Sequence, residues 1–105
     1  MKPIDHQTAA QILADVSLNL IRRGADGSLV LSMDKWRFES LTDEAITLTP
    51  EPPAPPETTP TVFLLHEIES VTWDRLAKQQ ERSQVRFRLK NGDLHTFSGR
   101  LPEPE

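Results

Sequence analysis

The sequence contains no cysteine and no tyrosine, and only four of its 105 residues are glycine. Without cysteine there is no disulfide framework, no thiolate zinc site and no cysteine nucleophile. No phosphate-binding loop, dinucleotide fingerprint or nucleophile elbow occurs, and four glycines could hardly supply one. No apolar run reaches the length of a membrane span, and the first residues lack the apolar core of a secretory signal. We therefore expect a cytoplasmic protein that is not an enzyme, with no membrane span, metal or cofactor.

Proline, by contrast, is abundant: six of the nine prolines lie in residues 50–60. Such a run cannot donate to a sheet ladder and favours extended polyproline II structure. We predict an exposed loop inside one domain, residues 1–105, because neither flank is long or apolar enough to fold alone. Residues 102–105 are predicted to be a disordered tail.

The charges are unevenly distributed along the chain. The formal net charge is −4, yet residues 75–100 carry seven basic side chains against two acidic ones. Four of the 16 acidic residues lie in the two proline-rich segments. This separation indicates a dipolar domain and not a general polyanion binder.

Residues 5–23 have the apolar spacing of an amphipathic helix, with Asp5 as its N-cap and Gly24 at its end. One apolar stripe faces the core. A second stripe, which includes Ala14, Leu18 and Ile21, flanks the first and has no obvious partner in a small sheet. We predict that this second stripe is the interface of a two-fold homodimer. The alternative is that another segment of the same chain covers it.

The apolar period changes to two in residues 28–49 and again in residues 62–98, which predicts short strands. Residues 28–40 are either two strands or one long strand bent near Asp34. A hairpin turns at Asn91 and Gly92, through either two or three residues. One helix cannot cover both faces of the resulting sheet. The predicted fold is therefore α+β: an N-terminal amphipathic helix packed on a curved, mostly antiparallel sheet or half-barrel of about six short strands.

Several large apolar side chains are assigned to one core by their alternation with polar neighbours. Trp36 and Trp73 are the two tryptophans of this core. The remaining predicted members are Phe63, Leu65, Phe87 and Leu89. A bend near Glu69 and Ser70 brings Val71 and Trp73 onto the core side.

Three stretches, residues 40–49, 66–73 and 85–97, resemble the pleckstrin-homology-like and GRAM-type small β domains of bacteria. In those domains a strand that opens Leu-Thr-acidic precedes an Ile-x-x-Val strand and a hairpin with the pattern apolar-x-apolar-x-Leu-Lys-x-Gly. The resemblance covers about half of the chain and implies a small β-barrel domain. That family closes its barrel with a C-terminal helix, whereas the helix predicted here is N-terminal.

A basic ladder is the candidate binding site. Arg86, Arg88 and Lys90 alternate with apolar residues and so point away from the core, and Arg75 and Lys78 precede them. Guanidinium groups at this spacing suit phosphates or an acidic protein surface. The alternative is that they form only the polar face that every amphipathic strand needs.

These observations predict a non-enzymatic interaction domain that binds a protein partner, through the basic ladder or the N-terminal helix. The alternative function is to bind anionic ligands, a lipid headgroup or a nucleic-acid phosphate, through the basic strand face. A nucleic-acid partner is not expected, because the chain has no tyrosine and no aromatic side chain beside the ladder for base stacking.

Overall fold

The structure, a computed structural model, describes residues 2–52, 58–77 and 82–104. These residues form eight strands in one antiparallel sheet, with a single α-helix and a single 3-10 turn. The elements are β1 (Lys2–Pro3), α1 (His6–Leu13), β2 (Leu18–Arg23), β3 (Leu29–Leu41), β4 (Ala45–Pro50), β5 (Thr61–Leu64), η1 (Leu65–Glu67), β6 (Ile68–Ala77), β7 (Arg82–Leu89) and β8 (Leu94–Gly99). The molecule is mostly β, so the predicted α+β fold, with a long helix on about six strands, is wrong.

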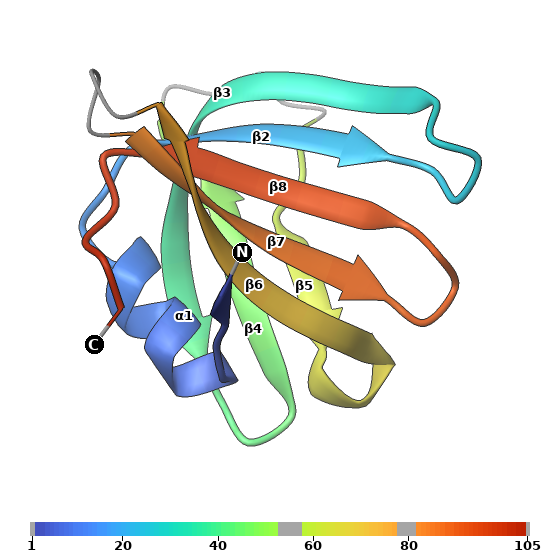
Figure 1. Cartoon of the computed structure of the whole chain (residues 1–105), viewed down its shortest axis with the longest axis horizontal. Coiled ribbons are helices and arrows are strands. Elements are labelled where there is room, and N and C mark those ends of the chain that lie inside the picture. The colour runs from blue at the N-terminus through green and yellow to red at the C-terminus, as the bar shows by residue number, and fades with distance from the viewer. Residues whose placement is uncertain (1, 53–57, 78–81, 105) are drawn as a thin grey trace.

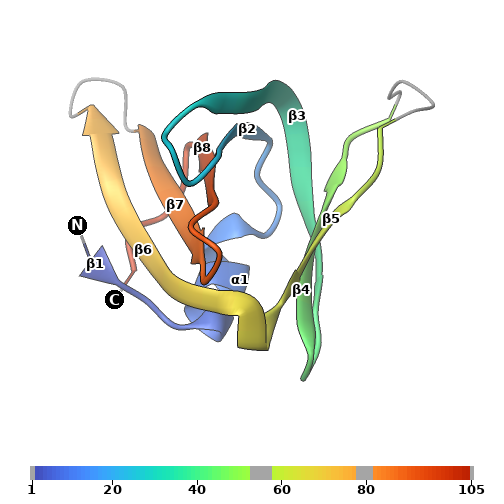
Figure 2. The ribbon, with the colours of Figure 1, turned by 90° about the vertical axis from the view of Figure 1, so that its right-hand side faces the viewer.

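The strands follow the order β1-β6-β7-β8-β2-β3-β4-β5 across the sheet (Figure 1). Two runs of consecutive strands, β2 to β5 and β6 to β8, are joined where β8 pairs with β2. Figure 2 shows that the sheet bends strongly, so that β6 and β7 belong to one arm and β4 and β5 to the other. The helix α1 lies between these two arms. The short strand β1 and the strand β5 form the two ends of the sheet.

The predicted helix of residues 5–23 ends at Leu13. Its start is as expected, because the Asp5 carboxylate accepts a hydrogen bond of 2.7 Å from the backbone N–H of Thr8. Three buried side chains, Ala9, Ile12 and Leu13, form the face that meets the sheet. Asp15 then adopts a left-handed φ of 60°, which is incompatible with a continuing α-helix and which aspartate tolerates better than most residues.

The second half of the predicted helix is strand β2. Leu18 and Leu20 are buried while Asn19 and Ile21 are exposed, which is the period of a strand and not of a helix. β2 pairs with β3 on one side and with β8 on the other. Hydrogen bonds along both edges of a central strand satisfy its backbone and so override a local helical pattern. The second apolar stripe, predicted to be a dimer interface, exists only at helical spacing and is therefore absent from this strand.

The open alternatives in the strand region are resolved. Residues 29–41 form one long strand, and the bend lies at Lys35, where φ is 63° and the register with β2 shifts. The β7–β8 hairpin has a three-residue turn, because the N–H of Leu89 bonds to the carbonyl of Asp93 and Gly92 has a φ of 98°. A register shift between Ile68 and Ser70 confirms the predicted irregularity in β6.

The two arms of the sheet meet through aromatic side chains. The rings of Phe63 on β5 and Phe87 on β7 are stacked, with centroids 4.8 Å apart and planes inclined by 11°. Phe97 packs edge-on against both rings. Both tryptophans are buried, as predicted, while Leu65 and Leu89 are partly buried at the border of this core.

The described part of each proline-rich segment contacts the body of the domain. The backbone N–H of Glu51 donates to the carbonyl of Lys35 at 2.7 Å, and residues 53–57 of the predicted loop lie outside the described residues. In the segment predicted to be a tail, the carbonyl of Pro104 accepts a hydrogen bond from Lys2 Nζ at 3.1 Å. Within the described ranges no helix has the length and apolar character needed to cross a membrane.

A pair of substitutions separates strand from helix in residues 18–23. Leu18→Glu should abolish cooperative unfolding at pH 7, because it places an unpaired carboxylate in the core. Ile21→Glu should change the free energy of unfolding by less than about 1 kcal/mol, because Ile21 lies on the outer face. Thermal unfolding followed by circular dichroism measures both effects. Equal tolerance of the two substitutions would contradict the buried position of Leu18.

Candidate functional site

Arg86 and Arg88 lie side by side on the outer face of β7, as the sequence predicts. The alternate residues Val85 and Phe87 are fully buried on the inner face. In the strand register, Thr72 of β6 lies beside Arg86, and Ser70 lies beside Arg88. We define the arginine face as the residues that line a shallow depression of about 50 Å³ on this side of the sheet: Ser70, Thr72, Arg86, Arg88 and Leu94.

A buried glutamine holds one of the two arginines. Gln84 precedes Arg86 on the same face of β7 and is only 5% exposed. With its amide oxygen turned toward the guanidinium, Gln84 accepts hydrogen bonds from Arg86 Nε at 2.8 Å and from Nη2 at 2.7 Å. These two bonds use two of the five guanidinium N–H donors and leave three for a ligand. Gln84 is thus a positioning residue for Arg86.

Neither arginine of this face forms an ion pair with another described residue. The ion pairs within 4.0 Å that join described residues lie elsewhere: Arg22 with Asp93, and Arg75 with Glu103. His66 Nε2 also lies 3.9 Å from a carboxylate oxygen of Glu67. Asp74 lies on the same side of the sheet, opposite Gln84 in the register. Among the described residues, no carboxylate oxygen therefore lies within 4.0 Å of either guanidinium group.

The other predicted binding residues do not join this face. Arg75 is opposite Ser83 on the inner side of β6, where it lies over the Trp73 ring at 5.6 Å and pairs with Glu103 at 3.6 Å. Lys90 is exposed in the turn after β7, and its backbone N–H donates to the carbonyl of Glu67. Lys78 lies outside the described residues. The ladder therefore reduces to Arg86 and Arg88, with Lys90 at its end.

Sequence reasoning missed the neighbours of the two arginines. Their alternation with apolar residues predicts that Ser70, Thr72 and Gln84 point outward. It does not predict that the strand of Ser70 and Thr72 lies beside β7. The pairing of β6 with β7 supplies that information. The hydroxyl groups of Ser70 and Thr72 add hydrogen-bond donors that charge counting alone does not identify.

The three predicted interface residues do not form one surface. Leu18 is buried in the core, Ile21 is exposed on the outer face of β2, and Ala14 caps the C-terminal end of α1. They share a helical face only if residues 14–21 are helical, and those residues are not. The helical face on which that interface is predicted is therefore absent from the described residues.

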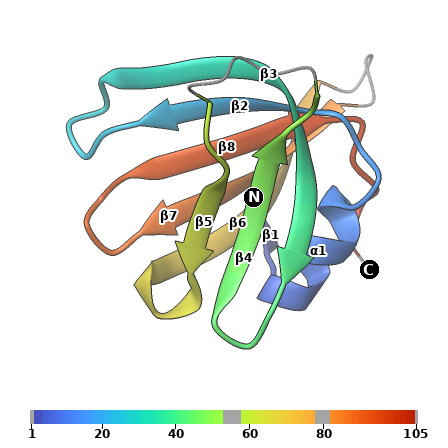
Figure 3. The same ribbon diagram turned by 180° about the vertical axis from the view of Figure 1, so that it is seen from behind.

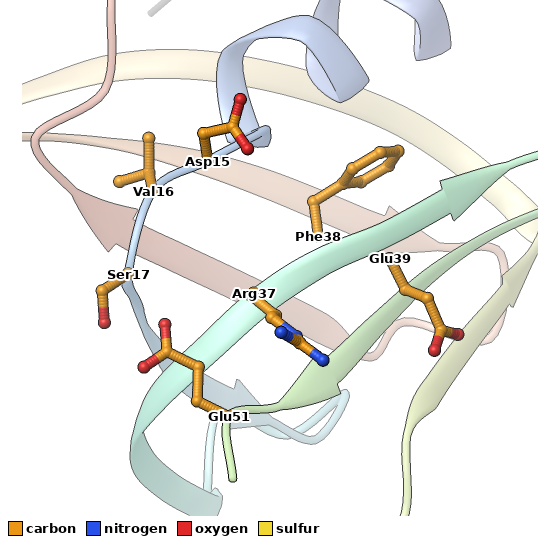
Figure 4. Close-up of a pocket in the computed structure, with 7 residues that line it drawn as sticks. All are labelled: Asp15, Val16, Ser17, Arg37, Phe38, Glu39 and Glu51. Carbon is orange, nitrogen blue, oxygen red and sulfur yellow. The ribbon is translucent and has the colours of Figure 1, made fainter.

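A pocket of about 540 Å³ lies between β3 and the segment after α1 (Figure 4). In Figure 4 the Arg37 side chain lies between those of Glu39 and Glu51. The remaining lining residues are Asp15, Val16, Ser17 and Phe38. The pocket has no histidine, so a serine–histidine pair cannot form there. Within the described ranges, no group of three potential ligand side chains could hold a metal ion.

A buried histidine lies beside the aromatic core. His95 on β8 is 4% exposed, and its ring meets that of Phe63 edge-on at 4.7 Å. Its Nδ1 atom is buried and has no hydrogen-bond partner within the described part of the chain. Burial, together with the charge of Arg22, lowers the pKa of His95 to about 4, against a weaker opposite effect of Asp93. The imidazole is therefore neutral at pH 7.

Comparisons with models of protein families, with curated proteins and with solved structures found no match to this chain. The resemblance to pleckstrin-homology-like and GRAM-type domains accordingly stays a prediction. The function of the chain has to be inferred from its own surface.

His95 predicts that the protein loses stability in mildly acidic solution. An unfolded histidine has a pKa of about 6.5, so between pH 6.5 and 4 the unfolded state binds a proton that the folded state does not. The free energy of unfolding should therefore fall by about 3 kcal/mol from pH 8 to pH 4. Urea unfolding across this range measures the change.

Two variants test this assignment. His95→Phe should remove most of the pH dependence between pH 6.5 and 4, whereas His66→Gln, at an exposed histidine, should retain it. Hydrogen bonds from Thr8 and Ser28 lower the pKa of the Asp5 and Asp26 carboxyl groups, respectively, from their ordinary values. The stability that these carboxylates contribute is lost mainly below about pH 4. An unchanged slope in His95→Phe would show that another group is responsible.

Proposed function

We propose that this chain is a non-enzymatic interaction domain that binds an acidic segment of a protein partner through the arginine face. The observation that carries the proposal is the pair Arg86 and Arg88, adjacent on one face of β7 and without an ion pair to any described carboxylate. Each guanidinium group can accept a carboxylate in a two-pronged hydrogen-bonded pair. Because Gln84 already orients Arg86, less conformational freedom is lost when a ligand binds.

The surroundings of the two arginines support a protein ligand. The outer face continues from Arg86 across Thr96 of β8 to Ile21 of β2, in direct strand register. Ile21 and Leu94 add aliphatic surface beside the charges and hydroxyl groups. A mixture of arginine, hydroxyl and aliphatic side chains is typical of protein interfaces. The register places no aromatic side chain on the described outer face of β6, β7, β8 and β2, so bases would have no ring to stack on.

A second candidate function is the binding of an anionic group, either a lipid headgroup or a nucleic-acid phosphate. One observation favours it: the hydroxyl-bearing Ser70 and Thr72 line the same depression as the two guanidinium groups. Arginine and hydroxyl donors converging on one small depression suit the oxygens of a phosphate group. The two candidates share a site and differ in the ligand.

Charge reversal tests the proposed site. Arg86→Glu combined with Arg88→Glu should leave the fold intact, because outward residues rarely contribute more than about 0.5 kcal/mol each. In NMR titrations with a short polyglutamate peptide, wild-type amide shifts should be centred on residues 70–72 and 86–88 and should vanish in the double variant. Raising the salt concentration should weaken binding steeply.

A matched control keeps the net charge of the double variant. Arg37→Glu combined with Arg100→Glu makes the same charge change at two exposed arginines away from the arginine face, and this variant should still bind the peptide. Equal loss of binding in both variants would show a net-charge effect and contradict the site. Binding of inorganic phosphate or anionic phospholipid vesicles, without binding of the peptide, would replace the proposal by the second candidate.

A further inference from the structure

The far edge of β5 is open. β5 is the last strand in the sheet order and pairs only with β4 (Figure 3). Val62 and Leu64, which point away from the core, are 55% and 37% exposed. An end strand with exposed aliphatic side chains is a surface on which another strand readily pairs.

The backbone groups at this edge can be assigned from one hydrogen bond. The N–H of Leu65 donates to the carbonyl of Glu44 at 2.9 Å, in register with the β4–β5 ladder. Since hydrogen-bonding directions alternate along an antiparallel strand, the backbone groups of Thr61 and Phe63 face β4. The N–H and C=O groups of Val62 and the N–H of Leu64 therefore face the open edge, where no strand of the described residues pairs with them. The C=O of Leu64 accepts the first hydrogen bond of the 3-10 turn η1, from the N–H of Glu67.

The two ends of the sheet differ in how they are protected. The opposite end is β1, a two-residue strand made of Lys2 and Pro3, and both residue types discourage strand pairing. β5 contains no charged residue and no proline, and its register with β4 has no bulge. Pro60 immediately before β5 and the 3-10 turn η1 immediately after it limit any new pairing to the four residues of the strand.

We infer that β5 pairs antiparallel with β5 of a second copy of this chain, forming a two-fold dimer with a continuous sheet. A two-fold axis at Phe63 places Val62 opposite Leu64 of the second copy, and each copy then donates the N–H of Leu64 to the open carbonyl of Val62 across the edge. The exposed aliphatic side chains pack across the same edge. Because β5 carries no charge, its self-pairing opposes no like charges.

This dimer is independent of the proposed function. The arginine face lies on β6, β7 and β8, whereas the dimer edge belongs to the other run of strands. A failure of peptide binding therefore leaves the dimer untouched, and a monomeric protein leaves the proposed function untouched.

Sedimentation velocity of the wild-type protein should show a monomer–dimer equilibrium between about 10 μM and about 1 mM, as expected for a small interface. Leu64→Lys should weaken dimerisation by about tenfold or more, because it replaces the aliphatic contact with Val62 of the second copy and places two like charges diagonally across the two-fold axis. Leu29→Lys makes the same change at a leucine of β3 that is 57% exposed and should leave dimerisation unchanged. A wild-type monomer throughout this range, or a dimer that Leu64→Lys does not weaken, overturns the proposal.

Amide hydrogen exchange tests the dimer without a substitution. The amides of Val62 and Leu64 should exchange slowly at high protein concentration and quickly at low concentration. The amides of Thr61 and Phe63, which face β4, should stay protected at both concentrations. Protection of Val62 and Leu64 that does not depend on concentration would mean that the chain covers its own edge, and would overturn the proposal.

Discussion

The pairing of β2 with β8 is the contact on which the rest of the structure depends. It runs from Asn19 opposite Ser98 to Arg23 opposite Leu94. This pairing joins the run of strands β6 to β8 to the run β2 to β5 in one sheet. The backbone at Gly99, the last residue of β8, approaches the segment before β2 closely, since a Cβ atom at Gly99 would lie 2.8 Å from the carbonyl oxygen of Ser17. A side chain at residue 99 would push β8 away from the segment that leads into β2.

This pairing also sets which surfaces remain free. With β2 and β8 joined, β5 is left as an end strand, while β7 lies well inside the sheet. The stack of Phe63 on Phe87 then links β5 to β7 across the bend, so the two arms share one core. The outer side of β7 consequently presents Arg86 and Arg88 from a strand that is paired along both edges. The open edge and the arginine face are both results of one strand order.

The turn of the β7–β8 hairpin decides the chemistry of β8. A three-residue turn places Phe97 opposite Val85, and the alternate residue His95 consequently faces the core while Leu94 faces outward. A two-residue turn would exchange His95 and Leu94 between the two faces. The low pKa of His95 and the aliphatic border of the arginine face thus depend on one additional residue in a turn.

Local patterns in the sequence determined several features by themselves: the cap at Asp5, the strand alternation that turns Arg86 outward, and the burial of both tryptophans. These features depend on neighbours within a few residues, which are the same in any fold. The sequence could not determine where the helix ends, since the leucines around residue 20 satisfy helical and strand periods alike. It also could not determine that Ser70 and Thr72 flank the arginines or that β5 is an end strand. Tertiary structure decided these points, because backbone hydrogen bonds between distant strands determine register, neighbours and edges.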